Sequence, residues 1–238
     1  MKALIAIDSF KGSLTSLEAG FAAERGVKDA FPDAECEVLA VADAGEGTTE
    51  AIIRGTGGRM RTVSVSDPLG RRISAEYGII DSSMTAVIEM SSAAGITLVA
   101  PDERNPLFTS TYGVGEMILD ALDLGVRRFI IGIGGSATND AGAGMLMVLG
   151  VGLYDNNGIQ ISRGAIGLSA LSKIDISTLD KRISECEFTV ASDVKNVLCA
   201  SLLPRRRYAL GHSARLRYNI ASGENSRGGY CNYWRRQT

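Results

Sequence analysis

The chain opens with the apolar run Ala3-Leu4-Ile5-Ala6-Ile7, which Asp8 closes. A continuous apolar run of this length is typical of a strand that is buried on both faces of a parallel sheet. A helix is expected next, because Thr15-Ser16-Leu17-Glu18 has capping-box spacing and apolar residues recur at helical intervals until Pro32. Residues 37–42 show a second buried-strand pattern, and residues 48–55 show the next helix. This alternation indicates a parallel sheet with right-handed crossover connections.

The pattern changes between residues 61 and 92. Three short strands are expected at residues 61–65, 73–80 and 85–90, because the turn sequences Asp67-Pro68-Leu69-Gly70 and Asp81-Ser82-Ser83 separate them. We interpret this part as a β-rich insertion that forms a second lobe. Helical spacing returns at residues 114–122, and further strands are expected at residues 129–133, 151–154 and 188–191. The predicted fold class is α/β, with a Rossmann-like parallel sheet, helices on both faces and a β-rich inserted second lobe.

Charge is distributed unevenly along the 238 residues, although the formal net charge is only −2. Residues 1–198 carry 17 Lys and Arg against 26 Asp and Glu, a net charge of −9. Residues 199–238 carry eight Arg, no Lys and the single acid Glu224, a net charge of +7. This last segment has no sustained apolar period, so it cannot bury enough surface to offset its ordering entropy. We expect an α/β region at residues 1–198 that is incomplete at its C-terminal end, followed by a basic, disordered tail.

The cysteines and the apolar runs indicate where the protein resides. The four cysteines show no C-x-x-C spacing, which indicates neither a zinc site nor a disulfide framework and fits a reducing compartment. The first apolar run is too short for a signal peptide, and no run approaches the length of a membrane span. We therefore expect a soluble cytoplasmic protein with no membrane or nucleic-acid partner, and the sequence leaves the oligomeric state open.

Polar loops follow several of the expected strands, which is where ligands bind in doubly wound sheets. Asp8-Ser9-Phe10-Lys11-Gly12-Ser13 precedes a helix N-terminus and offers phosphate ligands, or else ordinary capping and solvated side chains. Asp43-Ala44-Gly45-Glu46-Gly47 offers two carboxylates that suit Mg²⁺ or a substrate hydroxyl, or else cap the next helix. Ser192-Asp193-Val194-Lys195-Asn196 combines an acid and an amide again, with a plain turn as its alternative.

The richest loop follows the strand expected at residues 129–133. It reads Gly132-Ile133-Gly134-Gly135-Ser136-Ala137-Thr138-Asn139-Asp140, a combination of glycines, hydroxyls, amide and acid that is typical of a phosphate cradle. It is not a Walker A loop, because Gly-Lys-Ser/Thr occurs nowhere in the chain. Gly132, Gly134 and Ala137 do match G-x-G-x-x-A, and Asp155 follows at the distance of a dinucleotide fingerprint. A nicotinamide-dependent oxidoreductase is therefore an alternative, although Thr138-Asn139-Asp140 is too polar for the tight packing that this fingerprint serves.

Five stretches together resemble, in order and spacing, the signatures of type I glycerate kinases. They are Asp8-Ser9-Phe10-Lys11-Gly12-Ser13-Leu14-Thr15, Ala42-Asp43-Ala44-Gly45-Glu46-Gly47-Thr48, Arg104-Asn105-Pro106-Leu107, the loop from Gly132 to Asp140, and Ala191-Ser192-Asp193-Val194-Lys195-Asn196. The resemblance covers residues 1–198. It implies a two-lobed α/β enzyme that transfers the γ-phosphoryl group of ATP to D-glycerate with Mg²⁺, usually giving the 2-phosphate.

The resemblance and the needs of phosphoryl transfer imply roles for individual residues. Lys11 is expected to hold phosphate or the glycerate carboxylate, and Asp43 and Asp193 to serve as Mg²⁺ ligands or as the general base. Which carboxylate is the base stays open. Further substrate or phosphate contacts are expected from Ser9, Ser13, Glu46, Gly134, Gly135, Ser136, Thr138, Asn139, Asp140 and Asn196.

The chain departs from the family pattern at three places. Ala44 and Ala141 stand where the family usually has glycine, and a methyl group is expected to crowd loops that need a positive φ or close backbone approach. Asn196-Val197-Leu198-Cys199-Ala200 replaces Asn-Pro-Leu-Cys-Gly, and the likeness ends there, as after a reading-frame shift or a misjoined gene end. Little kinase activity is therefore expected of this chain. A non-enzymatic truncated product, with its arginines in contact with nucleic acid or a membrane, is the third interpretation.

Overall fold

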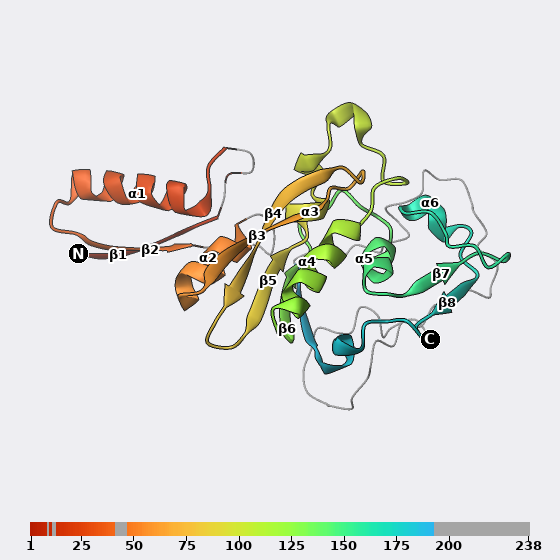
Figure 1. The fold of residues 1–238 in the computed structure, drawn as a ribbon. Coiled ribbons are helices and arrows are strands. Elements are labelled where there is room, and N and C mark those ends of the chain that lie inside the picture. Colours follow the sequence, from red (N-terminus) through yellow and green to blue (C-terminus); the bar gives the residue numbers. More distant parts are fainter. Residues whose placement is uncertain (9, 11–12, 41–46, 193–238) are drawn as a thin grey trace, which may run out of the picture.

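A computed structural model describes residues 1–8, 10, 13–40 and 47–192 (Figure 1). Its centre is a five-stranded sheet in the order β3-β4-β5-β6-β9, in which β5, β6 and β9 are parallel and β3, β4 and β5 are antiparallel. These strands are β3 (Arg59–Ser66), β4 (Arg72–Ile80), β5 (Thr85–Glu89), β6 (Arg128–Gly132) and β9 (Glu187–Ala191). The longer helices are α1 (Ser16–Ala30), α2 (Thr48–Thr56), α4 (Tyr112–Asp123) and α5 (Ala143–Val148). The predicted α/β class is confirmed.

Hydrophobic side chains pack on both faces of the central sheet. Along β5, Ala86 and Ile88 join the larger core, which includes the apolar side of α4. Val87 lies between them in the chain and packs instead with Ile53 of α2. Every residue of β5 is buried, as expected for a strand with helices on both faces. The prediction of helices on both faces of the sheet is therefore confirmed.

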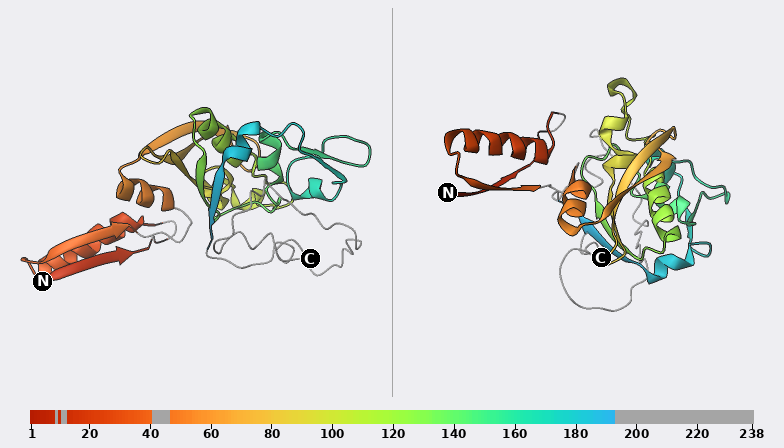
Figure 2. Two further views of the ribbon diagram at one scale, coloured as in Figure 1. Left: turned by 90° about the horizontal axis from the view of Figure 1, so that it is seen from below. Right: turned by 60° about the vertical axis from the view of Figure 1, so that its left-hand side comes forward.

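The first two strands form a unit of their own. β1 (Lys2–Ile7) and β2 (Glu35–Ala40) pair in parallel, and Figure 2 shows α1 along one face of this pair, to one side of the central sheet. The capping box predicted at Thr15 and Glu18 is present. Leu4 is 65% exposed and Leu39 is 45% exposed, on the face opposite α1. The expectation that residues 3–7 are buried on both faces, within the same sheet as residues 129–133, is wrong for the described residues, because only α1 covers this pair.

A second small sheet was not expected from the sequence. β7 (Gly152–Tyr154) pairs antiparallel with β8 (Lys173–Asp175) instead of extending the central sheet. The remaining elements are three to five residues long, too short to show a period in the sequence. They are α3 (Ser91–Ala94), α6 (Ala165–Leu168) and the 3₁₀ turns η1 (Ile96–Leu98), η2 (Pro101–Glu103) and η3 (Lys181–Glu185).

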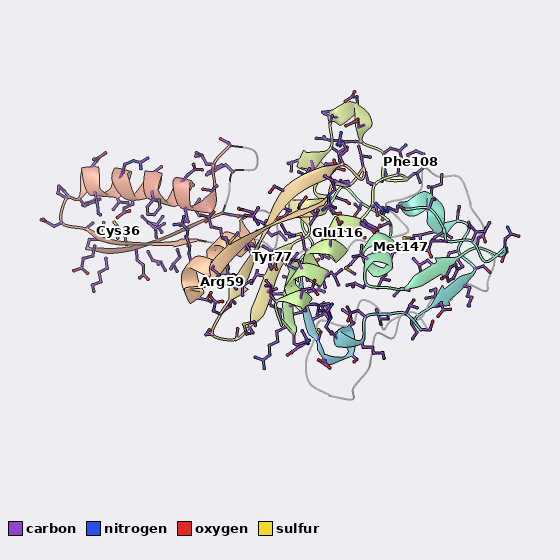
Figure 3. All side chains as sticks on the ribbon, viewed as in Figure 1. Cys36, Arg59, Tyr77, Phe108, Glu116 and Met147 are labelled. Atoms are coloured by element: carbon purple, nitrogen blue, oxygen red, sulfur yellow. The ribbon has the colours of Figure 1, made fainter. Side chains whose placement is uncertain are left out.

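Charged side chains fix α4 on the central sheet. Tyr77 of β4, labelled in Figure 3, is fully buried, and its hydroxyl donates a 2.6 Å hydrogen bond to Asp120 of α4. Arg61 of β3 donates two further bonds to the same carboxylate, at 2.6 and 2.8 Å. These bonds from Arg61 hold the pKa of Asp120 below its ordinary value, and burial raises the pKa of the Tyr77 hydroxyl.

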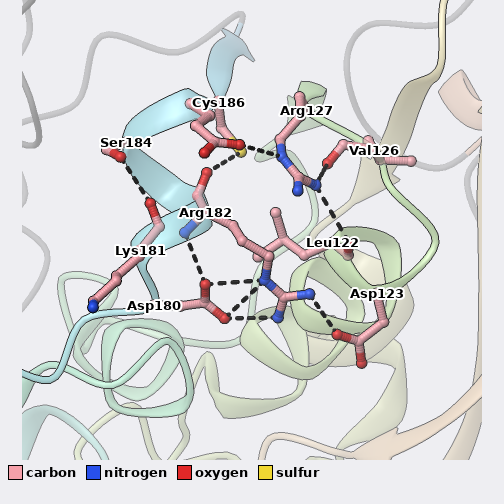
Figure 4. A network of polar contacts seen from close by, with 10 residues as sticks. Leu122, Asp123, Val126, Arg127, Asp180, Lys181, Arg182, Ser184 and Cys186 are labelled. Atoms are coloured by element: carbon pink, nitrogen blue, oxygen red, sulfur yellow. Dashed lines mark hydrogen bonds and ion pairs between the residues drawn. The ribbon is translucent and has the colours of Figure 1, made fainter.

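The segment before β9 is tied to the end of α4 by the polar network in Figure 4. Arg182 forms 2.7 Å ion pairs both with Asp180 and with Asp123, the last residue of α4. The rings of Phe129 and Phe188 stack with centroids 4.8 Å apart, so that β6 and β9 also adhere through their side chains. The last described strand is thereby fixed in place beside β6.

The predicted basic tail lies outside the described residues, and so does the proposed boundary at residue 198. Within the described part of the chain, no helix is long and apolar enough to cross a membrane.

Candidate active site

A pocket of about 360 Å³ lies beyond the C-terminal end of β6. Two segments form its walls, one running from η1 to the start of α4 and the other being the glycine loop that follows β6. The residues that line it are Ile96, Val99, Arg104, Asn105, Pro106, Thr109, Ser136, Ala137, Thr138 and Asn139. This volume is in the range of small-molecule sites, and the position after a parallel strand is the one expected for a ligand in an α/β fold.

Backbone hydrogen bonds join the two walls. The N–H of Ile96 donates to the carbonyl of Gly135 at 2.9 Å, and the N–H of Ala137 donates to the carbonyl of Ala94 at 2.8 Å. The hydroxyl of Thr109 donates a 2.8 Å bond to the carbonyl of Ala137. The glycine loop is therefore held on both sides before any ligand binds.

Three of the predicted ligand residues meet in this pocket. The hydroxyls of Ser136 and Thr138 lie 2.8 Å apart, and the backbone N–H of Thr138 donates to the Ser136 hydroxyl at 3.0 Å. Asn139 is only 8% exposed. Its side-chain amide has no hydrogen-bond partner among the described residues, and since no buried side-chain nitrogen or oxygen there lacks a partner, the amide is open to the pocket.

Arg104 brings a positive charge to the opposite wall. Its Nε donates a 3.1 Å hydrogen bond to the carbonyl of Val99, which fixes the base of the guanidinium group. It forms no ion pair with any residue in the described ranges, and its side chain is exposed. Arg104, Asn105 and Thr109 had no assigned role from the sequence. Two sequence features could have indicated these residues. Arg104 and Asn105 belong to the signature stretch from Arg104 to Leu107, and Thr109 belongs to the run of hydroxyl residues that precedes α4.

Asp140 does not line the pocket. It is 1% exposed, and its two carboxylate oxygens together accept five hydrogen bonds from Ser110, Thr111, Gly142 and Gly144. Oδ2 accepts four of these bonds and Oδ1 accepts one, and the residue is too buried to reach the pocket. In this pocket the geometry of Asp140 is that of a support beneath the loop, and its predicted contact with substrate or phosphate stays a prediction.

Ala141, which stands where the family usually has glycine, has a left-handed backbone conformation. Ala141 has a φ of +53°, the left-handed region that favours glycine, and Gly142 follows with a φ of +77°. The methyl group is thus accommodated at a strained position. Ala44, the other departure, lies outside the described residues.

Six predicted site residues lie outside the described part of the chain: Ser9, Lys11, Asp43, Glu46, Asp193 and Asn196. Their roles stay predictions. Ser13 is exposed in the turn before α1, where its backbone N–H donates to the carbonyl of Phe10 at 2.8 Å. Gly134 and Gly135 belong to the glycine loop but do not line the pocket.

Asp155, the acidic residue of the dinucleotide alternative, is not placed to bind a dinucleotide. Asp155 follows β7, which belongs to a different sheet from β6, so it does not lie at the end of a neighbouring parallel strand. Its carboxylate accepts backbone bonds from Ile159 at 2.9 Å and Asn157 at 2.8 Å, and these bonds hold its pKa below the ordinary value. Asp155 stabilises a surface turn. The geometry thus departs from the arrangement that a ribose hydroxyl needs.

The Mg²⁺ ligands predicted from the sequence are carboxylates. In the described ranges, no group of three or more His, Cys, Asp or Glu residues lies close enough together to hold an ion. Asp43 and Asp193, the predicted Mg²⁺ ligands, belong to the residues that are not described.

The fold and the pocket define a class of protein. The loop after a parallel strand supplies an amide and hydroxyls, and the facing wall supplies an arginine, which are groups with which an α/β protein can bind a small anionic molecule. Comparison with known proteins gives the family. Residues 3–202 match the glycerate kinase family, and the chain belongs to that family of phosphotransferases.

Curated relatives and a solved structure agree with this assignment. The chain is 52% identical over 198 residues to a glycerate kinase of Bacillus subtilis and 49% identical over 198 residues to a glycerate 2-kinase of Escherichia coli. Each alignment covers 83% of this chain and 52% of the relative, so the chain spans about half the length of these relatives. A crystal structure described as a glycerate kinase 2 from Salmonella typhimurium LT2 matches with a TM-score of 0.72 and 51% identity, over 83% of this chain and 53% of that one.

Proposed function

We propose that this chain forms the glycerate-binding region of an enzyme that transfers the γ-phosphoryl group of ATP to D-glycerate, with Mg²⁺ as cofactor. Membership of a kinase family supports the transfer. The name of the Escherichia coli relative, a glycerate 2-kinase, supports 2-phosphoglycerate as the product. A cytoplasmic location belongs to the same proposal, since Cys36 and Cys186 are free thiols, which fits a reducing compartment.

The observation that carries this proposal is the amide of Asn139. A polar side-chain group that lines a pocket without a protein partner is free to form hydrogen bonds with a ligand. Asn139 lines the pocket, and among the described residues its side-chain amide has no hydrogen-bond partner although no buried side-chain nitrogen or oxygen there lacks one, so the amide is open to the pocket, where a ligand would bond it. An amide can both donate and accept, which suits a hydroxyl group of the substrate.

The charge and size of the pocket fit glycerate. D-glycerate is a three-carbon molecule with one carboxylate and two hydroxyls, well within a volume of about 360 Å³. The guanidinium of Arg104 would hold the carboxylate, because its planar fork matches a carboxylate in geometry as well as in charge. The hydroxyls of Ser136 and Thr138 would complete the contacts to the rest of the molecule.

Residues outside the described ranges would supply the transfer chemistry. Phosphoryl transfer depends on positioning and charge neutralisation more than on covalent catalysis. Lys11 would neutralise the phosphate, and Asp43 and Asp193 would hold Mg²⁺ or accept the proton of the attacking hydroxyl, since carboxylate oxygens are the ligands that Mg²⁺ prefers. When bound, Mg²⁺ would offset the negative charge of the phosphates.

An assay of ATP consumption tests the proposal. It compares the 238-residue chain with a chimera in which residues 199–238 are replaced by the part of the Bacillus subtilis relative that follows its matched region. The chimera is expected to consume ATP only when D-glycerate and Mg²⁺ are both present. A chimera that reduces NAD⁺ with a hydroxy acid and ignores ATP would contradict the proposal.

A further inference from the structure

Two helices begin at the carboxylate of Asp140. At the start of α4, Thr111 donates to Oδ2 from its backbone N–H at 2.9 Å and from its hydroxyl at 3.0 Å. At the start of α5, the N–H of Gly144 donates to the same oxygen at 3.1 Å, and the N–H of Gly142 donates to Oδ1 at 3.1 Å. Free N–H groups and the positive end of the helix dipole both favour a carboxylate at such a place.

The first residues of α4 and α5 lie so close together that position 144 has no room for a side chain. A Cβ atom on Gly144 would lie 2.7 Å from the backbone nitrogen of Tyr112, so no side chain is possible there. The hydroxyl of Thr111 also accepts a 3.0 Å bond from the N–H of Met145, and so links Asp140 to α5 a second time. One buried charge therefore holds the N-termini of both helices together.

Two residues close to these bonds in the sequence, Asn139 and Thr109, line the pocket. Asn139 directly precedes Asp140, and Thr109 stands two residues before Thr111. The Thr109 hydroxyl in turn holds the carbonyl of Ala137 in the opposite wall. Any displacement of Asp140 would move Asn139 relative to Thr109, and with it the distance between the two walls.

We propose that Asp140 is the positioning residue of this pocket: it touches no ligand, and it sets the place of Asn139 by joining the N-termini of α4 and α5. The proposal rests on the proposed function for the identity of the ligand. It predicts that loss of the Asp140 charge weakens ligand binding more than its cost in stability alone would. Replacement of Thr111 by Ser, which keeps the hydroxyl that bonds Asp140, should preserve ligand binding.

The experiment is a calorimetric titration of the 238-residue chain with D-glycerate. Asp140→Asn and the milder Thr111→Val are expected to weaken binding by about tenfold or more, because a ligand hydrogen bond is lost or lengthened. Thr111→Ser retains the hydroxyl and should bind like the unaltered chain. Asp120→Asn is the matched control. Asp120 is also a hydrogen-bonded carboxylate and lies in α4, but its partners are Arg61 and Tyr77 of the central sheet and not residues near the pocket.

Each result of these measurements either supports or overturns the positioning role of Asp140. Equal binding by the Asp140→Asn and Thr111→Val variants would overturn the positioning role while leaving the proposed function intact. An equal loss of affinity in Asp120→Asn would also overturn it, because general destabilisation would then explain the effect. If the unaltered chain does not bind D-glycerate, the proposed function fails, and hydrogen exchange decides the positioning role alone. Faster exchange at residues 109–112 and 134–139 in Asp140→Asn than in Asp120→Asn supports the role, and the same exchange in both variants excludes it.

Discussion

The hydroxyl of Thr109 donates a 2.8 Å hydrogen bond to the carbonyl oxygen of Ala137, across 28 positions of sequence. Both residues line the pocket, and Thr109 is only 1% exposed. The bond joins the wall that carries Arg104 to the wall that carries Asn139. The shape of the pocket therefore depends on a single buried hydroxyl as well as on the backbone bonds around it.

Replacement of Thr109 by Val tests this dependence. The substitution keeps the shape of the side chain but leaves the carbonyl of Ala137 unpaired, so the free energy of unfolding should fall by about 1–3 kcal/mol. Thr109→Ser keeps the hydroxyl and should restore most of this loss. Urea unfolding followed by circular dichroism measures both. Equal stability of Thr109→Val and the unaltered chain would mean that the bond contributes nothing.

Arg104 should determine affinity for a carboxylate without affecting stability. Since the side chain is exposed and its only bond in the described part of the chain goes to a backbone carbonyl, Arg104→Ala should leave the melting temperature nearly unchanged. Its affinity for D-glycerate should fall by about 10- to 100-fold, because a charge-assisted contact is lost. Arg104→Lys keeps the charge but not the planar fork and should bind with intermediate affinity. Titration calorimetry of the three proteins would contradict the assignment if all bind D-glycerate equally.

The strained residue in the glycine loop offers a stabilising substitution. Ala141→Gly should raise the free energy of unfolding by about 1 kcal/mol, because the left-handed region costs an alanine more than a glycine. The neighbouring Gly142→Ala is the matched opposite. An added methyl group there meets only the end of Met145, at 3.6 Å, so the expected loss of about 1 kcal/mol would come from φ alone. Urea midpoints of the two variants should move in opposite directions, and a shift in the same direction would contradict this account.

Asp120 should make stability depend on pH in the acid range. Its pKa in the folded protein lies below the ordinary value of 3.8, because Arg61 and Tyr77 donate to the ionised carboxylate. The stabilisation is therefore complete well above pH 3.8 and is lost as the pH falls through the lowered folded value. Asp120→Asn should lower the free energy of unfolding by about 1–2 kcal/mol at pH 7 and by much less in strong acid. A difference that stays constant from pH 7 down to pH 2.5, measured by urea unfolding, would exclude this linkage.

The order of strands and helices could be predicted because burial leaves a period in the sequence. The turn sequence before β5 and the capping box of α1 are local signals, and both elements form where they were expected. Which strands share a sheet could not be predicted in this way. The run at residues 3–7 resembles a doubly buried strand, yet Leu4 is exposed because the pairing partner and the covering helix depend on the tertiary arrangement.

The candidate site was predicted in part for the same reason. Ser136, Thr138 and Asn139 were identified because they follow a strand, and they do line a pocket. Asp140 carries the same kind of side chain at the next position, but only the packing of α4 against α5 shows that its oxygens are already bonded. Arg104 comes from a segment without a regular period, so its approach to the glycine loop was not visible from spacing.

The central claim is that D-glycerate binds between the Arg104 segment and the glycine loop. Hydrogen–deuterium exchange of the 238-residue chain, with and without saturating D-glycerate, tests it most directly. The account predicts slower exchange at residues 99–109 and 134–144 when D-glycerate is present, and little change in β7 and β8. Binding of D-glycerate with protection confined to other parts of the chain, or no protection anywhere, would contradict it.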